Sequence, residues 1–253
     1  MPDATTPAGD AVADATRRLL SARRGGGAQP AADLPDAPAA YAVQAAVAEA
    51  LGWFGGGVPR HWKSGGAGRT AVLTHAPLPP AGVHASPADL RGVPFHFRGI
   101  EAEIALRLGE PVDAARAALG APVAIDAMCV AIEVVDSRWV EGVQAPPLAK
   151  LADLQSHGAL VLGDWVSYAA RDWAAQAVRV EIGERVLDFR GTHAFGDPTW
   201  GLPAWLRHAT QGGAVLPAGT VVTTGTWCGL PMAAAGDAVR VVFDGIGEAR
   251  LQF

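Results

Sequence analysis

Apolar residues recur at helical spacing over the first fifty residues of the chain. The first such segment, residues 11–23, carries basic residues near its end, where they interact favourably with a helix dipole, and three glycines at 25–27 stop it. A second segment opens at Asp36 or Pro38 and continues to Leu51. The pattern therefore predicts two helices at the beginning of the chain.

From Val58 onward, short runs rich in Val, Ile and Leu alternate with Gly and Pro, which is typical of strands separated by turns. The predicted strands cover residues 102–108, 130–135, 159–162, 178–182, 221–224 and 239–243. Two further helices are predicted at 111–119 and 203–211, the second with a proline in its first turn. We therefore expect an α+β, β-dominated fold, with a helical N-terminal lobe over residues 1–57 and a β-rich domain over residues 58–253 that together form one compact unit.

The composition argues against several classes of protein. Half of the 253 residues are hydrophobic and 18% are charged, which supplies a core and argues against disorder. With 20 Lys and Arg against 25 Asp and Glu, the formal charge of −5 argues against a dedicated nucleic-acid or anionic-membrane surface. The sequence contains neither a signal-peptide pattern nor an apolar stretch of about 18 residues, so we expect a cytoplasmic protein. The two cysteines, Cys129 and Cys228, are predicted to be buried free thiols.

Two glutamates share one face of a predicted strand. In residues 101–108, with the sequence EAEIALRL, a period of two puts Glu101 and Glu103 on the face opposite Ile104 and Leu106. At roughly 3.3 Å per residue, the two carboxylates lie about 7 Å apart along the strand. Two interpretations fit this pair: an exposed strand edge with two solvated glutamates, or a cation held between two like charges.

A third glutamate, Glu133, lies in an apolar run, where a charge is costly. Residues 130–135 carry Val and Ile on both sides of it, which predicts a strand buried on both faces. Its charge is balanced either by an ion pair, with Arg138 or Arg107 as candidate partner, or by a metal ion shared with the glutamate pair. Because no histidines stand at metal-ligand spacing beside it, an oxygen-preferring ion such as Mg²⁺ or Mn²⁺ fits better than Zn²⁺.

The glutamates belong to a longer series of motifs. These are residues 101–105 (EAEIA), 131–138 (AIEVVDSR), 153–163 (DLQSHGALVLG), 216–225 (LPAGTVVTTG) and 229–232 (GLPM). Together they resemble the fumarylacetoacetate hydrolase superfamily, and within it the 2-oxopent-4-enoate (2-keto-4-pentenoate) hydratases and the related 4-oxalocrotonate decarboxylases. Residues 41–44 (YAVQ) match the N-terminal lobe of that family, so the resemblance extends over most of the chain.

This resemblance implies a mixed β-roll built around a metal ion, usually in a homo-oligomer. It implies that Glu101, Glu103 and Glu133 bind Mg²⁺ or Mn²⁺. It also implies a hydratase, a lyase that adds water to a 2-hydroxypenta-2,4-dienoate and yields a 4-hydroxy-2-oxo acid in the degradation of aromatic compounds. The ion would bind the 2-oxo acid head of this small substrate and stabilise its enolate.

Two lysines are the candidate catalytic groups. Lys63 stands where the hydratases carry a lysine, which implies a proton shuttle or a partner for the substrate carboxylate. Lys150 matches a Lys-x-x-Asp motif of the hydrolase branch of the superfamily. For both residues, the alternative is a solvated surface lysine.

Five further residues are candidate substrate ligands. Asp153 and Ser156 belong to a segment that lines the family's pocket, or else they cap a turn. Thr224, Gly225 and Thr226 follow a predicted strand and offer backbone N–H and hydroxyl donors to a carboxylate, or else they form a β-turn.

The remaining polar residues near these motifs are assigned supporting roles. We expect Asp136 and Arg138 to brace Glu133 rather than to touch substrate. Each of the histidines at 75, 157 and 193, taken singly, is predicted to be structural or exposed rather than catalytic.

Residues 64–82 depart from the hydratase pattern, because an acidic residue of that family is missing there and His75 stands near its place. The departure leaves two alternatives to hydration. One is a decarboxylase or C–C hydrolase acting on an oxalocrotonate-like or acylpyruvate-like 2-oxo acid, and the other is a non-catalytic protein that binds a 2-oxo acid. Residues 64–70 lack the Gly-Lys-Ser/Thr of a P-loop, so we predict a flexible loop over the pocket.

Overall fold

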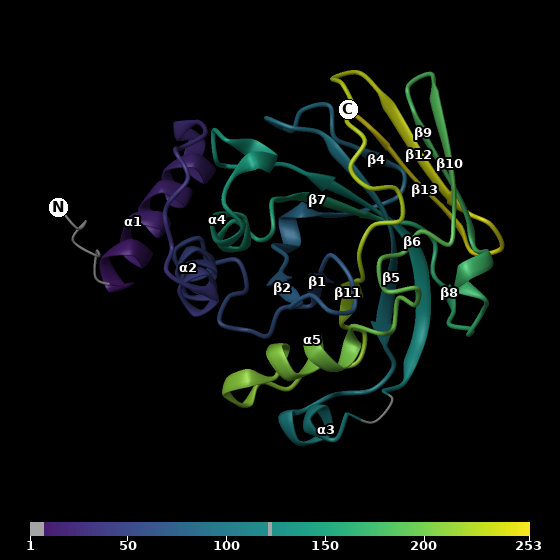
Figure 1. Cartoon of the computed structure of the whole chain (residues 1–253), viewed down its shortest axis with the longest axis horizontal. Helices are drawn as coiled ribbons and strands as arrows, with labels where there is room; N and C mark the ends of the chain where they lie inside the picture. Colours follow the sequence, from purple (N-terminus) through teal and green to yellow (C-terminus); the bar gives the residue numbers. More distant parts are fainter. Residues whose placement is uncertain (1–7, 121–122) are drawn as a thin grey trace.

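Two β-sheets that lie against each other form most of the structure, and helices lie to one side of them and at one end (Figure 1). The computed structural model describes residues 8–120 and 123–253. The eight-stranded sheet has the order β2-β1-β11-β5-β6-β7-β3, with β8 paired to β6. Its strands are β1 (His61–Gly65), β2 (Thr74–Pro77), β3 (Val83–Ala85), β5 (Gly99–Leu108), β6 (Ile125–Val135), β7 (His157–Leu162), β8 (Val166–Ser167) and β11 (Val221–Thr223).

The five-stranded sheet has the order β10-β9-β12-β13-β4. Its strands are β4 (Ala88–Asp89), β9 (Ala177–Ile182), β10 (Arg185–Arg190), β12 (Ala238–Phe243) and β13 (Gly247–Gln252). The α-helices are α1 (Ala8–Ser21), α2 (Ala37–Ala50), α3 (Ala114–Ala118), α4 (Pro147–Ala152) and α5 (Leu202–Ala209). Short helical turns are η1 (Ala22–Gly26), η2 (Pro80–Gly82), η3 (Gly142–Gln144), η4 (Trp173–Ala175) and η5 (Gln211–Gly213).

The main core fills the space between the two sheets. Ile104 and Ile132 of the eight-stranded sheet are fully buried there with Val180 and Val241 of the five-stranded sheet. Because side chains alternate along a strand, the residues between these apolar positions point to the other face of the eight-stranded sheet. The three glutamates singled out in the sequence occupy that other face.

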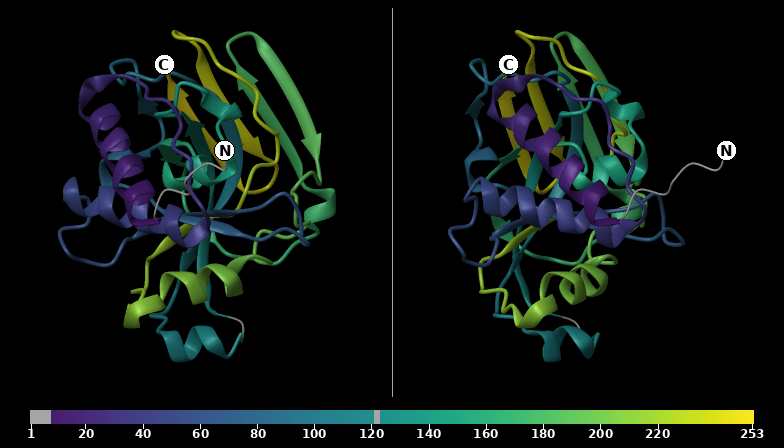
Figure 2. Two further views of the ribbon diagram at one scale, coloured as in Figure 1. Left: turned by 60° about the vertical axis from the view of Figure 1, so that its left-hand side comes forward. Right: turned by 90° about the vertical axis from the view of Figure 1, so that its left-hand side faces the viewer.

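The helices α1, α2 and α4 form a second apolar core beside the eight-stranded sheet (Figure 2). Leu19 of α1 and Val43 of α2 are buried in it together with Trp139, which follows β6 and donates its indole N–H to the carbonyl oxygen of Ala149 at 2.7 Å. Asp36 caps α2 by accepting the backbone N–H of Ala39 at 2.8 Å. The N-terminal helices therefore pack on the segments that follow β6, while a lobe boundary at residue 57 stays a prediction.

The α+β, β-dominated fold class is confirmed. Each predicted helix and strand coincides with an observed one, with ends that differ by a few residues; the helix predicted at 111–119, for example, begins only after Asp113, which caps it. Several observed strands were not predicted; β1 is one of them, because its sequence HWKSG is polar although its central residues are buried. Sequence patterning thus finds apolar strands and overlooks a polar strand that lines a site.

Cys129 and Cys228 are buried free thiols, as predicted. Within residues 8–120 and 123–253, no helix combines the length and the hydrophobicity needed to cross a bilayer.

Glycine at position 163 is required by the packing of the two sheets, and Gly163→Ala is expected to destabilise the protein by about 1–3 kcal/mol. A methyl group there would clash with the carbonyl oxygen of Glu248 and lie 3.1 Å from that of Val130. Urea unfolding measures the loss of stability. Gly92→Ala is the matched control, since a methyl group at position 92 meets nothing within 4 Å, and equal stabilities of the two variants would contradict the prediction.

Candidate metal centre

Three carboxylates converge on one face of the eight-stranded sheet. Strands β5 and β6 pair antiparallel with Glu101 directly opposite Glu133, and Glu103 lies two residues further along β5 on the same face. One carboxylate oxygen from each glutamate can be chosen so that all lie within 4.8 Å of one another. Glu103 and Glu133 are 1% and 0% exposed, and Glu101 is half-buried, so the first interpretation of a solvated edge does not hold.

Lys63 supplies a positive charge to this cluster. Strand β1 lies parallel to β11 and antiparallel to β2, which places Lys63 beside Thr223 in the same sheet as the glutamates. The Nζ of Lys63 lies 2.5 Å from Oε1 of Glu133 and donates to the carbonyl oxygen of Gln155 at 3.2 Å. Lys63 is buried, so the alternative of a solvated surface lysine is wrong.

The arginines considered as partners of Glu133 bind elsewhere. Arg107 pairs with Asp126 at 2.9 Å, and Arg138 pairs with Asp153 at 2.7 Å. Arg138 is near Glu133 in sequence and Arg107 lies on the paired strand β5, but an ion pair depends on where side chains point. The alternative of an ion pair with Arg138 or Arg107 is therefore wrong, and Glu133 pairs with Lys63, a residue 70 positions away.

A histidine that sequence reasoning assigned no role at the site also touches Glu133. The Nδ1 of His157, at the start of β7, lies 3.2 Å from Oε1 of Glu133, the same oxygen that pairs with Lys63. His157 is 3% exposed. The signal that would have found it is weak: a histidine directly before an apolar strand, in the segment that carries the family motif.

Burial and mutual repulsion shift the ionisation of the cluster. Burial, followed by the charge of Glu133, raises the pKa of Glu103 to about 7, and burial also raises the pKa of Glu101 well above its ordinary value. Burial acts on Glu133 as well, but Lys63 and His157 outweigh it and hold the pKa of that carboxyl below its ordinary value. The three glutamates together keep the pKa of Lys63 raised despite its burial.

The donor set fits a divalent cation with oxygen ligands. One lysine cannot balance three carboxylates, and a metal ion would offset the remaining repulsion. Among the described residues, Oε2 of Glu133 is buried and has no hydrogen-bond partner, which leaves it available to an ion. Glu103 is oriented by the backbone N–H of Gly225, which donates to its Oε2 at 2.8 Å. Carboxylate oxygens alone favour Mg²⁺ or Mn²⁺ over softer metals.

The segment 224–226 lies beside the glutamates. Apart from the contact of Gly225 with Glu103, the hydroxyl of Thr224 donates to the carbonyl oxygen of Ile104 at 3.0 Å, and that of Thr226 donates to Gly229 at 2.9 Å. These contacts shape the loop after β11. Substrate binding by Thr224, Gly225 and Thr226 stays a prediction.

Asp153 precedes a strained turn, and Ser156 is its last residue. Leu154, Gln155 and Ser156 have φ angles of 53°, 55° and 60°, the left-handed region that costs a non-glycine residue about 1–2 kcal/mol. Asp153 is fully buried and held by Arg138 at 2.7 Å and by Arg23 of the helical lobe at 3.0 Å. Substrate binding by Asp153 and Ser156 stays a prediction.

The neighbours of Glu133 in sequence brace this turn rather than Glu133 itself. Asp136 accepts the backbone N–H groups of His96 and Phe97 at 3.0 and 2.8 Å, and its own N–H donates to the carbonyl oxygen of Ser156 at 2.9 Å. Arg138 holds Asp153, as described above. The bracing expected of Asp136 and Arg138 therefore reaches Glu133 only through the turn that precedes β7.

Lys150 is the predicted site residue whose contacts lie apart from the cluster. It stands on α4, half-buried, and its Nζ donates to the carbonyl oxygen of Val143 at 3.2 Å. A catalytic role for Lys150 stays a prediction.

The segment predicted as a loop over the pocket is partly strand. Ser64 belongs to β1, where it lies 3.0 Å from Nδ1 of His75, on the opposite face of the strand from Lys63. Beyond it, Arg69 donates to the carbonyl oxygen of Phe195 at 2.7 Å and lies 5.8 Å from the ring centre of Trp200. The tip of this hairpin is therefore attached to the segment before α5.

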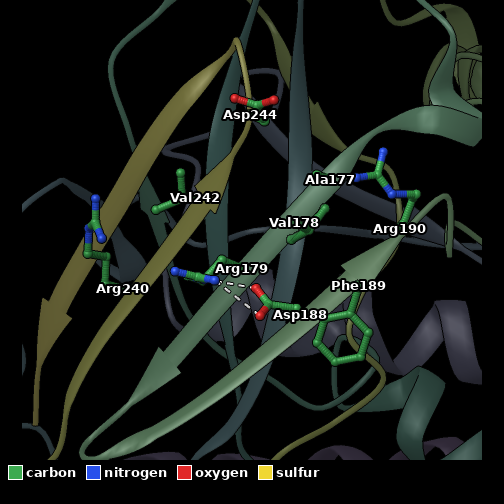
Figure 3. Close-up of a pocket in the computed structure, with 9 residues that line it drawn as sticks. All are labelled: Ala177, Val178, Arg179, Asp188, Phe189, Arg190, Arg240, Val242 and Asp244. Atoms are coloured by element: carbon green, nitrogen blue, oxygen red, sulfur yellow. Dashed lines mark hydrogen bonds and ion pairs between the residues drawn. The ribbon is translucent and has the colours of Figure 1, made fainter.

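A hollow elsewhere on the molecule does not involve the cluster. Figure 3 shows it on the five-stranded sheet, with a volume of about 620 Å³. Arg179 and Asp188 pair across its floor at 2.8 Å, and none of the predicted site residues lines it. We therefore locate the chemistry at the buried carboxylates.

Comparison with known proteins identifies relatives of the chain. Residues 74–253 match the fumarylacetoacetate (FAA) hydrolase C-terminal family. A comparison with curated proteins gave no match.

Several solved structures are similar in fold. The 4-oxalocrotonate decarboxylase from Pseudomonas putida G7, complexed with magnesium and adipate, is 20% identical, with 99% of this chain and 100% of that chain covered and a TM-score of 0.78. The same enzyme complexed with calcium and acetate gives a TM-score of 0.76 at 20% identity and the same coverage. The 2-hydroxyhepta-2,4-diene-1,7-dioate isomerase from Mycobacterium marinum is 18% identical, with 77% and 74% covered and a TM-score of 0.54.

In protein freed of divalent ions, the raised pKa of Glu103 predicts that stability falls as pH rises. With a pKa of about 7 in the folded state against 4.5 ordinarily, the folded state binds more protons than the unfolded state between these values. The contribution is present below pH 4.5, is lost as pH rises through about 7, and amounts to about 3 kcal/mol. Urea unfolding across this range in the presence of a chelator measures it.

Glu103→Gln should weaken the dependence, because an amide does not titrate, whereas Glu101 still does. Glu49→Gln, an exposed residue of α2, should leave it unchanged. Parallel pH profiles for wild-type protein and Glu103→Gln would contradict the assignment.

Proposed function

The chain belongs to the fumarylacetoacetate hydrolase family, and on this premise we propose that it is a divalent-cation-dependent lyase. The reaction proposed is addition of water to a 2-hydroxypenta-2,4-dienoate-like substrate, which yields a 4-hydroxy-2-oxo acid in the degradation of aromatic compounds. One observation carries the proposal: Glu101, Glu103 and Glu133 converge in a site where Lys63 is the partner of Glu133. Such a site suits a substrate that becomes anionic as it reacts.

The three glutamates would bind the substrate head through a metal ion. When bound, Mg²⁺ or Mn²⁺ would accept the carboxylate and 2-oxo oxygens and act as a Lewis acid that stabilises the enolate. Glu101, Glu103 and Glu133 would hold the ion. Gly225, whose N–H orients Glu103, keeps that carboxylate in place during the reaction.

Lys63 is the candidate for proton transfer. Hydration needs a proton at C5 and an activated water at C4 of the substrate. The raised pKa of Lys63 means that its ammonium group is charged and can serve as a proton donor or as a partner of the substrate carboxylate. Its contacts with Glu133 and with the carbonyl oxygen of Gln155 hold Nζ at the edge of the carboxylate cluster.

Decarboxylation is the second candidate, and the full-length similarity to a 4-oxalocrotonate decarboxylase favours it. Loss of carbon dioxide from an oxalocrotonate-like diacid passes through an enolate that the same ion would stabilise. The complex of that relative with adipate, a dicarboxylate, supports a site that accepts a second acidic group. Hydration and decarboxylation differ at the end of the substrate that is remote from the metal.

We also expect assembly into a homo-oligomer in the cytoplasm.

A substrate panel separates the candidates. We expect 2-hydroxypenta-2,4-dienoate to lose its ultraviolet absorbance in the presence of the enzyme and Mg²⁺, and mass spectrometry should show the gain of one water. Release of carbon dioxide from 4-oxalocrotonate without hydration of the dienoate would establish the second candidate instead. Binding of Mg²⁺ and oxalate with no turnover of either compound would indicate a non-catalytic protein.

Glu133→Gln tests the metal assignment under the same assay. Removal of a ligand charge is expected to lower kcat/KM by at least about 100-fold, because both ion binding and enolate stabilisation depend on it. Glu181→Gln on the five-stranded sheet is the matched control and should retain full activity. Full activity of Glu133→Gln would remove Glu133 from the ligand set.

A further inference from the structure

The two oxygens of the Glu133 carboxylate have different surroundings. Oε1 lies 2.5 Å from Nζ of Lys63 and 3.2 Å from Nδ1 of His157. Oε2 is buried and, among the described residues, has no hydrogen-bond partner. A carboxylate held by two donors on one oxygen presents its other oxygen in a defined direction.

The imidazole of His157 donates a hydrogen bond to Oε1 of Glu133. A carboxylate oxygen only accepts hydrogen bonds, so Nδ1 of His157 carries the hydrogen that it donates to Glu133. The opposite ring nitrogen, Nε2, is buried without a hydrogen-bond partner in the described part of the chain. The hydrogen bond to Glu133 is therefore the polar contact that orients the imidazole.

The strained turn before β7 places one donor to Glu133 and holds the other. The left-handed residues Leu154, Gln155 and Ser156 lead directly into His157, whose N–H donates to the carbonyl oxygen of Leu154 at 3.2 Å. Gln155 turns its carbonyl oxygen toward Nζ of Lys63, at 3.2 Å. Strain in three consecutive residues persists only where the surroundings impose it, and here it places one holder of Lys63 and one donor to Glu133.

We propose that His157 is a positioning residue that fixes Glu133 so that its Oε2 faces the metal ion. The proposal rests on the proposed function, since it assumes that the glutamates bind a divalent ion. Without His157, only the flexible four-carbon chain of Lys63 would hold Oε1. Because the terminal torsion of a glutamate is soft, that single contact would let the carboxylate rotate. The rigid imidazole adds the second contact that stops the carboxylate from rotating. Histidine at 157 would thus raise the affinity for the ion without touching it.

Because His157 contacts Glu133 through Nδ1, its role can be tested with side chains that place a donor at Nδ1 or at Nε2. An asparagine amide at position 157 reproduces a donor near Nδ1, whereas a glutamine amide reaches the place of Nε2. Titration calorimetry with Mn²⁺ on the purified, metal-stripped protein gives the dissociation constant directly. We expect His157→Ala to bind Mn²⁺ about 10–100-fold more weakly than wild-type protein, in the range found for groups that orient metal ligands.

Substitution by the two amides should give different results. His157→Asn is expected to restore binding to within about threefold of wild-type protein, and His157→Gln to remain close to the alanine variant. If His157→Ala does not fold, as judged by circular dichroism, the comparison of Asn with Gln decides alone. His75→Asn is the matched control, because His75 is equally buried but contacts Ser64 on the other face of β1.

The outcomes separate this inference from the proposed function. Wild-type protein that binds no Mn²⁺ overturns the proposed function and this inference with it. Wild-type protein that binds Mn²⁺ while His157→Ala binds it equally well overturns the role of His157 alone. Equal weakening in His157→Asn and His157→Gln also overturns it, because general loss of packing would then account for the effect.

Discussion

The repulsion among three carboxylates in one small buried volume is the constraint on which the rest of the site depends. Glu101, Glu103 and Glu133 place oxygens within 4.8 Å of one another, and two of the three are shut off from solvent. Like charges at this distance and burial are stable only with protons or cations among them. The protein supplies one cation, Lys63, and leaves the rest of the charge for a metal ion to neutralise.

The fold meets this constraint by pairing strands that are far apart in sequence. Strand β1 reaches β5 through β11, which brings Lys63 to carboxylates on strands 40 and 70 residues later in the chain. The helical lobe contributes as well, since Arg23 and Arg138 both hold Asp153 at the start of the strained turn. Residues outside the carboxylate cluster thus hold the segments that surround it.

The carboxylate cluster by itself does not distinguish the two proposed reactions. In the proposed site, a metal ion and Lys63 would act on the 2-oxo acid head, which hydration and decarboxylation have in common. The chemistry that distinguishes them occurs at the far end of the substrate. The segment in which this sequence departs from the hydratase pattern includes the hairpin between β1 and β2.

Local periodicity by itself determined the strand faces, the helices and the pairing of Glu101 with Glu103 on one side, because alternation and capping involve residues close in sequence. An apolar run likewise marked Glu133 as buried. The family resemblance then identified Lys63 as a candidate catalytic residue. Only the tertiary structure decided that Glu133 pairs with Lys63 and His157 instead of Arg138 or Arg107, since that choice depends on strand order. It alone decided the left-handed turn at 154–156, because Leu, Gln and Ser disfavour this conformation and surrounding contacts impose it.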